Sequence, residues 1–276
     1  MHGKELVNEA IQTNAAVVAN LVQAKNDAVQ AYMMHHVADS SKWMWLPHVS
    51  MQMPFSLTVH GMMVIATALF LVILLGSVGR RKQEVPTGLA NVVEAFVKYI
   101  RDEMVIPSLG EEDGRKMTPM FCTFFFFILA MNLLGLVPCL YCATSNLGVT
   151  AALAVITLGF MIFGAIWKVG FVAFLKGFAP PGIPKIMLPM IATIEVISMF
   201  IRAMALAIRL FANMLAGHLV IYSLLGLIVV FGYFGAPALV AALGIYVMEV
   251  FVSFLQAYIF TLLSAIFIGE RYHPAH

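Results

Sequence analysis

The sequence predicts an all-α protein that crosses a membrane about five times and carries one amphipathic helix on the cytoplasmic surface. Of its 276 residues, 62% are hydrophobic and only 11% are charged, and the mean hydropathy is +0.93. Globular chains carry about 25% charged residues and lack repeated apolar runs of about twenty residues. A lipid membrane is therefore the expected surrounding. The net charge of +2 is too small to indicate a nucleic-acid partner.

The chain divides into residues 1–50, an expected extracytoplasmic N-terminal segment, and residues 51–276, a single membrane domain. Apolar residues of the first segment recur near helical spacing and predict a weakly amphipathic helix outside the membrane. Trp43 and Trp45 precede the first apolar run, as aromatic residues commonly do at a membrane interface. Neither an apolar signal core nor an Arg/Ser-rich transit character is visible, so we expect a multi-pass protein of a bacterial inner membrane.

The first span is predicted at residues 55–78 and ends at the basic cluster Arg80-Arg81-Lys82. Such clusters normally stay on the cytoplasmic side, which places the N-terminus outside. Seven Lys and Arg lie between residues 80 and 119, three between 168 and 185, and one at Arg271, against three in the N-terminal segment. Five passes with a cytoplasmic C-terminus satisfy this distribution.

Residues 88–105 have an amphipathic pattern, with Glu94 and Lys98 as an i,i+4 pair on the polar face. The segment is too charged to span a membrane, so it predicts a helix on the cytoplasmic surface. The charged run at residues 111–116 is expected to be a solvated loop.

The second and third spans are predicted at residues 118–140 and 147–167, joined by a short uncharged link. Asn132, a polar residue in the second span, forms an interhelical hydrogen bond or makes a minor contribution to a site. Cys139 and Cys142 have the spacing of a redox motif. However, the three cysteines form an odd set, and we interpret them as small residues near a helix end. Neither they nor the histidines have metal-ligand spacing, so no metal site is predicted.

The last two spans, residues 188–231 and 237–268, are too long to stand upright. As straight helices they would measure roughly 65 and 48 Å, against a hydrocarbon core of about 30 Å. A steep tilt keeps their apolar length in the membrane. We therefore expect a slanted antiparallel hairpin that offers a long flank to a curved partner.

Glu195, Arg202 and Arg209 are separated by seven residues each in the fourth span, and Asn213 follows four residues later. On a helix these residues share one face, which drifts only about 20° per heptad. An arginine at the centre of a membrane helix costs roughly 3 kcal/mol, so ionisable residues there indicate a functional site. This face must contact protein or water and not lipid.

Further polar residues divide the predicted hairpin into two zones. His218 lies nine residues after Arg209, roughly 180° around a helix, so it serves a different environment or the helix bends near Gly217. In an antiparallel hairpin Gln256 reaches the depth of Arg209, and Glu249 that of His218. Arg209 then separates two zones. The inner zone comprises Glu195, Ser198 and Arg202, and the outer zone comprises Asn213, His218 and Glu249.

Two motifs of this hairpin resemble those of one family. The run MALAIRLFANMLAGHL at residues 204–219 and the run LQAYIFTLL at residues 255–263 are similar to those of subunit a of F-type ATP synthases. The second motif begins about fifty residues after the first, as in that family. The five-pass plan, the basic cluster after the first span and the surface helix also agree. The likeness covers about residues 35 to 270.

The resemblance implies a proton-translocating stator subunit of the F0 sector, which forms two offset half-channels against a rotating ring of c subunits. The implied partners are the c-ring, the peripheral-stalk b subunits and the rest of the F1F0 complex. Chemistry on ATP would belong to those partners, since the chain has no phosphate-binding glycine loop. We expect no catalytic site and no cofactor in this chain.

The resemblance also assigns roles to individual residues. Arg209 matches the essential arginine that exchanges with the c-ring carboxylate, Glu195 the carboxylate of the cytoplasmic half-channel, and Gln256 the glutamine beside the arginine. Asn213, His218 and Glu249 match positions that line the outer half-channel. His218 and Glu249 are exchanged relative to many bacterial members, which leaves the location of the proton between them open. Gly135 stands where some relatives have an acidic residue, so it receives no role.

Alternative readings remain at this point. Arg209 could instead form a buried ion pair with Glu195 or Glu249 that only fixes helix packing. A secondary transporter would show internal repeats and broken helices, which the sequence lacks. A purely structural scaffold would not need a charge at Arg209.

Overall fold

The structure is a computed structural model that describes residues 2–37, 58–79, 88–137, 140–178 and 187–273. Within these ranges all regular structure is helical. Five helical segments are long and apolar enough to cross a membrane: Val59–Val78, Glu111–Leu136, Leu147–Val169, Leu188–Phe231 and Ala236–Tyr272. The predicted all-α, multi-pass architecture is confirmed.

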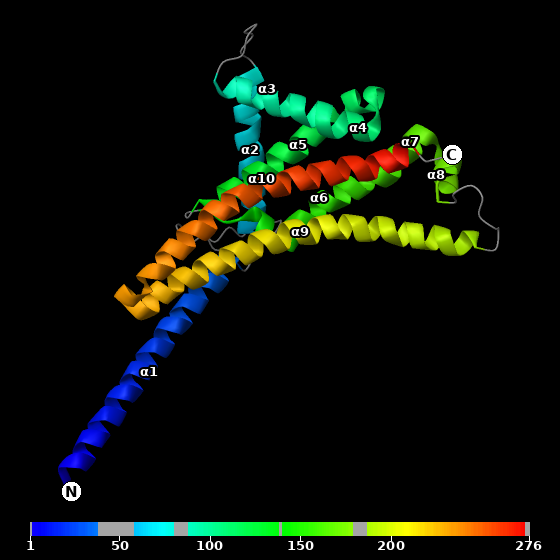
Figure 1. Ribbon diagram of the computed structural model, residues 1–276. Helices are drawn as coiled ribbons and strands as arrows, with labels where there is room; N and C mark the ends of the chain where they lie inside the picture. Colours follow the sequence, from blue (N-terminus) through cyan, green and yellow to red (C-terminus); the bar gives the residue numbers. More distant parts are fainter. Residues whose placement is uncertain (1, 38–57, 80–87, 138–139, 179–186, 274–276) are drawn as a thin grey trace.

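The first spanning helix, α2 (Val59–Gly79), stands upright in Figure 1, and α3 (Leu89–Tyr99) lies across its end. α3 continues as a π-helical turn, Ile100–Val105 (η1), and then as α4 (Ile106–Leu109). Its apolar face is buried against the bundle, with Ile100 and Met104 almost inaccessible. The predicted amphipathic helix is therefore present, and its last turn widens to π-helix. The basic cluster at 80–82 lies outside the described residues.

The predicted loop at residues 111–116 is wrong, because α5 (Glu111–Leu136) begins at Glu111. Acidic side chains in a first turn stabilise the positive end of the helix dipole. Two i,i+4 ion pairs add to this effect: Glu111 with Arg115 and Glu112 with Lys116, each 2.7 Å long. The charged run therefore belongs to the helix that enters the membrane.

The third span is composite. It consists of α6 (Leu147–Gly159), a π-helical turn at Phe160–Gly164 (η3), and α7 (Ala165–Val169). A short link that contains the 3-10 turn Ala143–Ser145 (η2) joins it to α5, and α8 (Phe171–Lys176) follows it.

The hairpin has the predicted form. α9 (Leu188–Phe231) and α10 (Ala236–Tyr272) run side by side, joined by the turn Gly232–Gly235 (η4). In Figure 1 both slant strongly relative to α2, and α9 curves along its length. α9 continues through Gly217 without interruption, so His218 serves a different environment and no break lies there.

The N-terminal helix α1 (His2–Val37) extends away from the turn end of the hairpin in Figure 1. It packs against α9, where the side chain of Val29 covers Gly226. The helix predicted for this segment is thus present, and most of its described side chains are exposed. It lies at the end of the bundle opposite to α3.

α5 and α10 form the centre of the core. Phe121, Ile128 and Met131 of α5 and Ala257 and Ile268 of α10 are completely or almost completely buried in one apolar cluster. Close backbone approach adds to this packing, because Gly269 of α10 lies directly against the carbonyl of Ser108.

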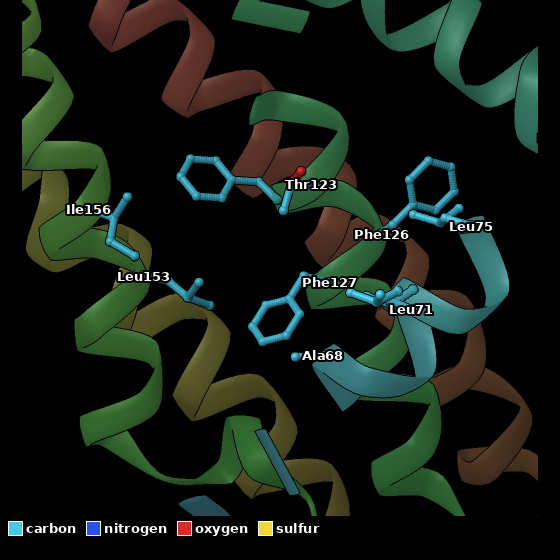
Figure 2. A pocket seen from close by; sticks show the side chains of 10 residues that line it. Ala68, Leu71, Leu75, Thr123, Phe126, Phe127, Leu153 and Ile156 are labelled. Carbon is cyan, nitrogen blue, oxygen red and sulfur yellow. The ribbon is translucent and has the colours of Figure 1, made fainter. Parts of the chain in front are cut away.

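α2 is the least buried of the spanning helices, and a cavity of about 490 Å³ is lined by α2, α5 and α6. Figure 2 shows Leu71 and Leu75 of α2 facing Phe126 and Phe127 of α5 across this space. Thr123 is the one polar side chain of its lining, and its hydroxyl donates to the carbonyl of Pro119 (2.8 Å). The cavity can hold an apolar group but offers no route for an ion.

The contact between Gly269 and Ser108 generates a test of the packing. A Cβ at residue 269 would collide with a backbone carbonyl, so Gly269→Ala should destabilise the fold by roughly 1–3 kcal/mol, as overpacking does. Gly159→Ala is the matched control, because nothing lies within 4 Å of a Cβ there. The thermal midpoint of the membrane-extracted complex would fall only for Gly269→Ala. Equal midpoints would contradict this packing.

Candidate functional site

His218 lies on the buried side of α9, facing α5. Its Nδ1 is 2.8 Å from the carbonyl oxygen of Met214, and its Nε2 is 3.1 Å from that of Gly135. Carbonyl oxygens only accept hydrogen bonds, so a neutral ring can satisfy one of these two contacts. An imidazolium, which has two N–H groups, satisfies both.

Glu249 of α10 is 2% exposed and lies against the same turn of α9. An added Cβ at Gly217 would overlap its carboxylate, so only glycine leaves room for it there. Glu249 also interacts electrostatically with His218. The predicted proximity of these two residues is therefore confirmed.

The link between α5 and α6 closes this region from one side. The hydroxyl of Thr144 donates to Asn132 Oδ1 (2.8 Å) and is 3.2 Å from the Cys142 sulfur. Asn132 and Thr144 are completely buried. Thr144 was not among the predicted site residues, because the sequence of an uncharged link does not indicate which hydroxyl faces the bundle. Asn132 is thus hydrogen bonded through its oxygen to the link η2, whereas an interhelical bond was expected.

Several buried polar atoms of the outer zone have no hydrogen-bond partner among the residues that the structure describes. They are Asn132 Nδ2, Asn213 Nδ2 and Glu249 Oε1. Such atoms are uncommon in folded proteins, where buried polar groups are nearly always hydrogen bonded. Their concentration between α5, α9 and α10 distinguishes this zone from the apolar core.

Arg209 lies on the opposite, exposed side of α9. No hydrogen bond or ion pair joins it to any residue that the structure describes. The exposed side chains around it are small, at Ala205, Ala212 and Ala216. Gln256, by contrast, is buried on α10, and no hydrogen bond between it and Arg209 is formed in this part of the chain.

The inner zone contains two ion pairs between α9 and the last turn of α10. Glu195 accepts a hydrogen bond from Arg271, and Arg202 donates to Glu270. Ser198 lies between them on α9 and is half-buried. The alternative in which Glu195 or Glu249 pairs with Arg209 is therefore not what the structure contains.

The partners Glu270 and Arg271 were missed as site residues. The sequence signal was present, since adjacent opposite charges end the last apolar run. Their pairing with Glu195 and Arg202 nevertheless depends on the register of the hairpin.

The family model described as "ATP synthase A chain" matches residues 60–269. The chain belongs to this family. The resemblance inferred from the two hairpin motifs is thereby confirmed.

Curated relatives agree with the family assignment. The chain is 46% identical over 215 residues to ATP synthase subunit a of Anaeromyxobacter dehalogenans (strain 2CP-C), which covers 75% of this chain and 55% of that protein. It is 42% identical to the subunit of Myxococcus xanthus, covering 80% and 74%, and 45% identical to that of Chloroherpeton thalassium, covering 86% and 75%. The chain thus spans from about half to three quarters of these relatives.

No group of three or more potential metal ligands occurs within the residues that the structure describes. Cys122 and Cys142 are buried free thiols, and Cys139 lies outside the described residues. Burial raises the pKa of the Cys142 thiol, which disfavours the reactive thiolate. The geometry around Cys142 is therefore that of an inert, packed thiol.

This assignment predicts slow chemistry at Cys142. In a Cys122→Ser/Cys139→Ser background, Cys142 should react with a permeant maleimide at least about tenfold more slowly than an exposed cysteine. The comparison variant adds Cys142→Ser and Leu147→Cys, because Leu147 is 48% exposed at the start of α6. Equal labelling rates would show that Cys142 is accessible.

Proposed function

We propose that this chain is the proton-translocating stator subunit of the F0 sector of ATP synthase. It forms two offset half-channels against a rotating ring of c subunits and couples proton flow to rotation and ATP synthesis. The observation that carries the proposal is Arg209, an exposed cation on a membrane-spanning helix without a counter-charge among the described residues.

The surroundings of Arg209 support a partner helix that brings a carboxylate. A guanidinium facing hydrocarbon is costly, so a counter-charge is needed. Alanines at 205, 212 and 216 let the backbone of another helix approach closely, as small residues do in membrane interfaces. Arginine also keeps its charge when desolvated, whereas a lysine can lose its proton.

Coupling follows from this one fixed charge. A carboxylate that travels through lipid must be neutral, because burying it ionised costs several kcal/mol. Beside Arg209 the ionised form becomes favourable, so the proton leaves into one half-channel. The carboxylate then takes a proton from the other half-channel before it re-enters lipid. The same positive charge prevents protons from passing directly between the half-channels.

The outer half-channel is formed by Asn213, His218 and Glu249, with a minor contribution from Asn132. The unpartnered buried atoms of this zone are what a hydrated proton path would require, since water can complete their hydrogen bonds. His218 contacts two backbone carbonyl oxygens through its ring nitrogens, with Glu249 as the neighbouring carboxylate. An imidazole can take up a proton at one ring nitrogen and release one from the other, which suits a relay.

The inner half-channel begins at Glu195, with Arg202 and Ser198 beside it. Gln256 is buried on α10, and in this proposal it lies beside the region between the two half-channels. Along α9, Arg209 stands between the two zones.

Orientation and location complete the proposal. The basic segments place α3 and the C-terminal end of α10 in the cytoplasm, and residues 1–50 outside, with residues 51–276 as one membrane domain. The membrane would be a bacterial inner membrane. The peripheral-stalk b subunits and the F1 sector would hold this subunit against the ring and carry out the chemistry on ATP.

Substitution of Arg209 tests the proposed function directly. Arg209→Gln should abolish ATP-driven proton pumping in vesicles while the complex still assembles, because the ring carboxylate loses its fixed counter-charge. Lys98→Gln serves as the control, since Lys98 is an exposed cation paired with Glu94 at 2.6 Å. Normal pumping by assembled Arg209→Gln would leave a structural scaffold as the better account.

A second prediction concerns the room that Gly217 leaves for Glu249. Gly217→Ala displaces the Glu249 carboxylate and should lower the pumping rate about ten- to a hundredfold, as small misplacements of reacting groups do. Glu249→Asp, which is one methylene shorter, should restore part of that rate in the double variant. If the losses of pumping rate caused by Gly217→Ala and by Glu249→Asp simply add in the double variant, the packing of Glu249 against Gly217 is not what limits pumping.

A further inference from the structure

The inner zone holds a contact that the family motifs do not include. Arg271 donates a hydrogen bond to Glu195 across the hairpin and is only 8% exposed, although it lies in the last turn of α10. We propose that Arg271 is a positioning residue that holds the Glu195 carboxylate at the cytoplasmic entrance, an inference that rests on the proposed function of this chain.

Burial and stacking distinguish this contact from an ordinary surface ion pair. The guanidinium of Arg271 lies 4.8 Å from the ring centre of Phe178, which follows α8. Exposed ion pairs contribute little because both side chains remain mobile in water. Arg271 is instead fixed between an aromatic ring and a carboxylate, so it presents its charge in one direction.

The other described charges near this end of the hairpin are two paired cations, Arg202 and Lys168, with their partners, and the exposed Lys176 of α8. Arg202 donates to Glu270 and stacks 5.2 Å from the ring centre of Phe267. Lys168 pairs with Asp113, whose carboxylate is also 3.6 Å from His273. Among these groups Arg271 is the cation that contacts Glu195.

The geometry of Glu195 shows what this contact achieves. Glu195 is 36% exposed, and one of its oxygens receives the Arg271 hydrogen bond. A glutamate side chain has several rotatable bonds, so without a partner it would sample many positions. Arg271 keeps the carboxylate on the hairpin, where it can exchange a proton with the cytoplasm on one side and with the ring on the other.

The test uses the complete complex with Arg271→Gln and Arg271→Lys. Arg271→Gln should slow ATP-driven pumping and alter its pH profile, because the Glu195 carboxylate loses the cation that holds it in place. Arg271→Lys should restore most of the rate and the original profile. An unchanged profile in assembled Arg271→Gln would overturn the inference.

Lys168→Gln is the matched control. Lys168 also pairs with a carboxylate and lies 5.4 Å from the ring centre of Tyr272, but it does not contact Glu195. A general weakening of this end of the bundle would alter both variants. If Lys168→Gln moves the pH profile as far as Arg271→Gln, the effect is structural and the inference fails.

A double variant shows whether Arg271 acts through Glu195. Glu195→Gln/Arg271→Gln should have the same pH profile as Glu195→Gln alone, because the carboxylate that Arg271 positions is absent from both. An additional shift in the double variant would contradict the inference. Arg209→Gln in the same assay separates the two proposals. If the Arg209→Gln complex still pumps, the proposed function fails. If it does not pump, an unchanged pH profile of Arg271→Gln removes only the inference about Arg271.

Discussion

The need for a counter-charge at Arg209 is the constraint on which the rest of the structure depends. A guanidinium at membrane depth must meet an opposite charge or water. Inside the described part of the chain, no acidic residue of the hairpin pairs with Arg209. Glu195 pairs with Arg271, Glu270 pairs with Arg202, and Glu249 is buried beside Gly217. Arg209 is thus left for a group from outside this chain.

The fold separates the polar groups by using the two sides of one helix. α9 places His218 on its buried side, 3.1 Å from the Gly135 carbonyl oxygen of α5, and Arg209 on its exposed side. Its length and slant spread the two zones along the membrane, so an inner and an outer site need not overlap (Figure 1). The glycine at 217 then allows α10 to bring Glu249 close to His218.

The sequence predicts the membrane helices well because apolar length is the dominant signal in lipid. The hairpin boundaries lie within a few residues of the prediction, and the depth match of Glu249 with His218 is confirmed. The start of α5 at Glu111 was not predicted. Its charges stabilise a helix end only where the chain is helical, and the charges alone do not show that it is. The pairing of Arg271 with Glu195 was also missed, since seven-residue spacing defines a face of one helix but not the register against another. Thr144 likewise depends on the path of a short link, which spacing does not determine.

The most direct measurement of the central claim is a cryo-electron microscopy structure of the assembled complex in a lipid nanodisc. The account predicts that the exposed side of α9, centred on Arg209 and the neighbouring alanines, faces the c-ring. It also predicts a ring carboxylate within salt-bridge or single-water distance of the guanidinium in at least one rotational state. A structure in which lipid covers this side, or in which Arg209 pairs within its own subunit in every state, would contradict it.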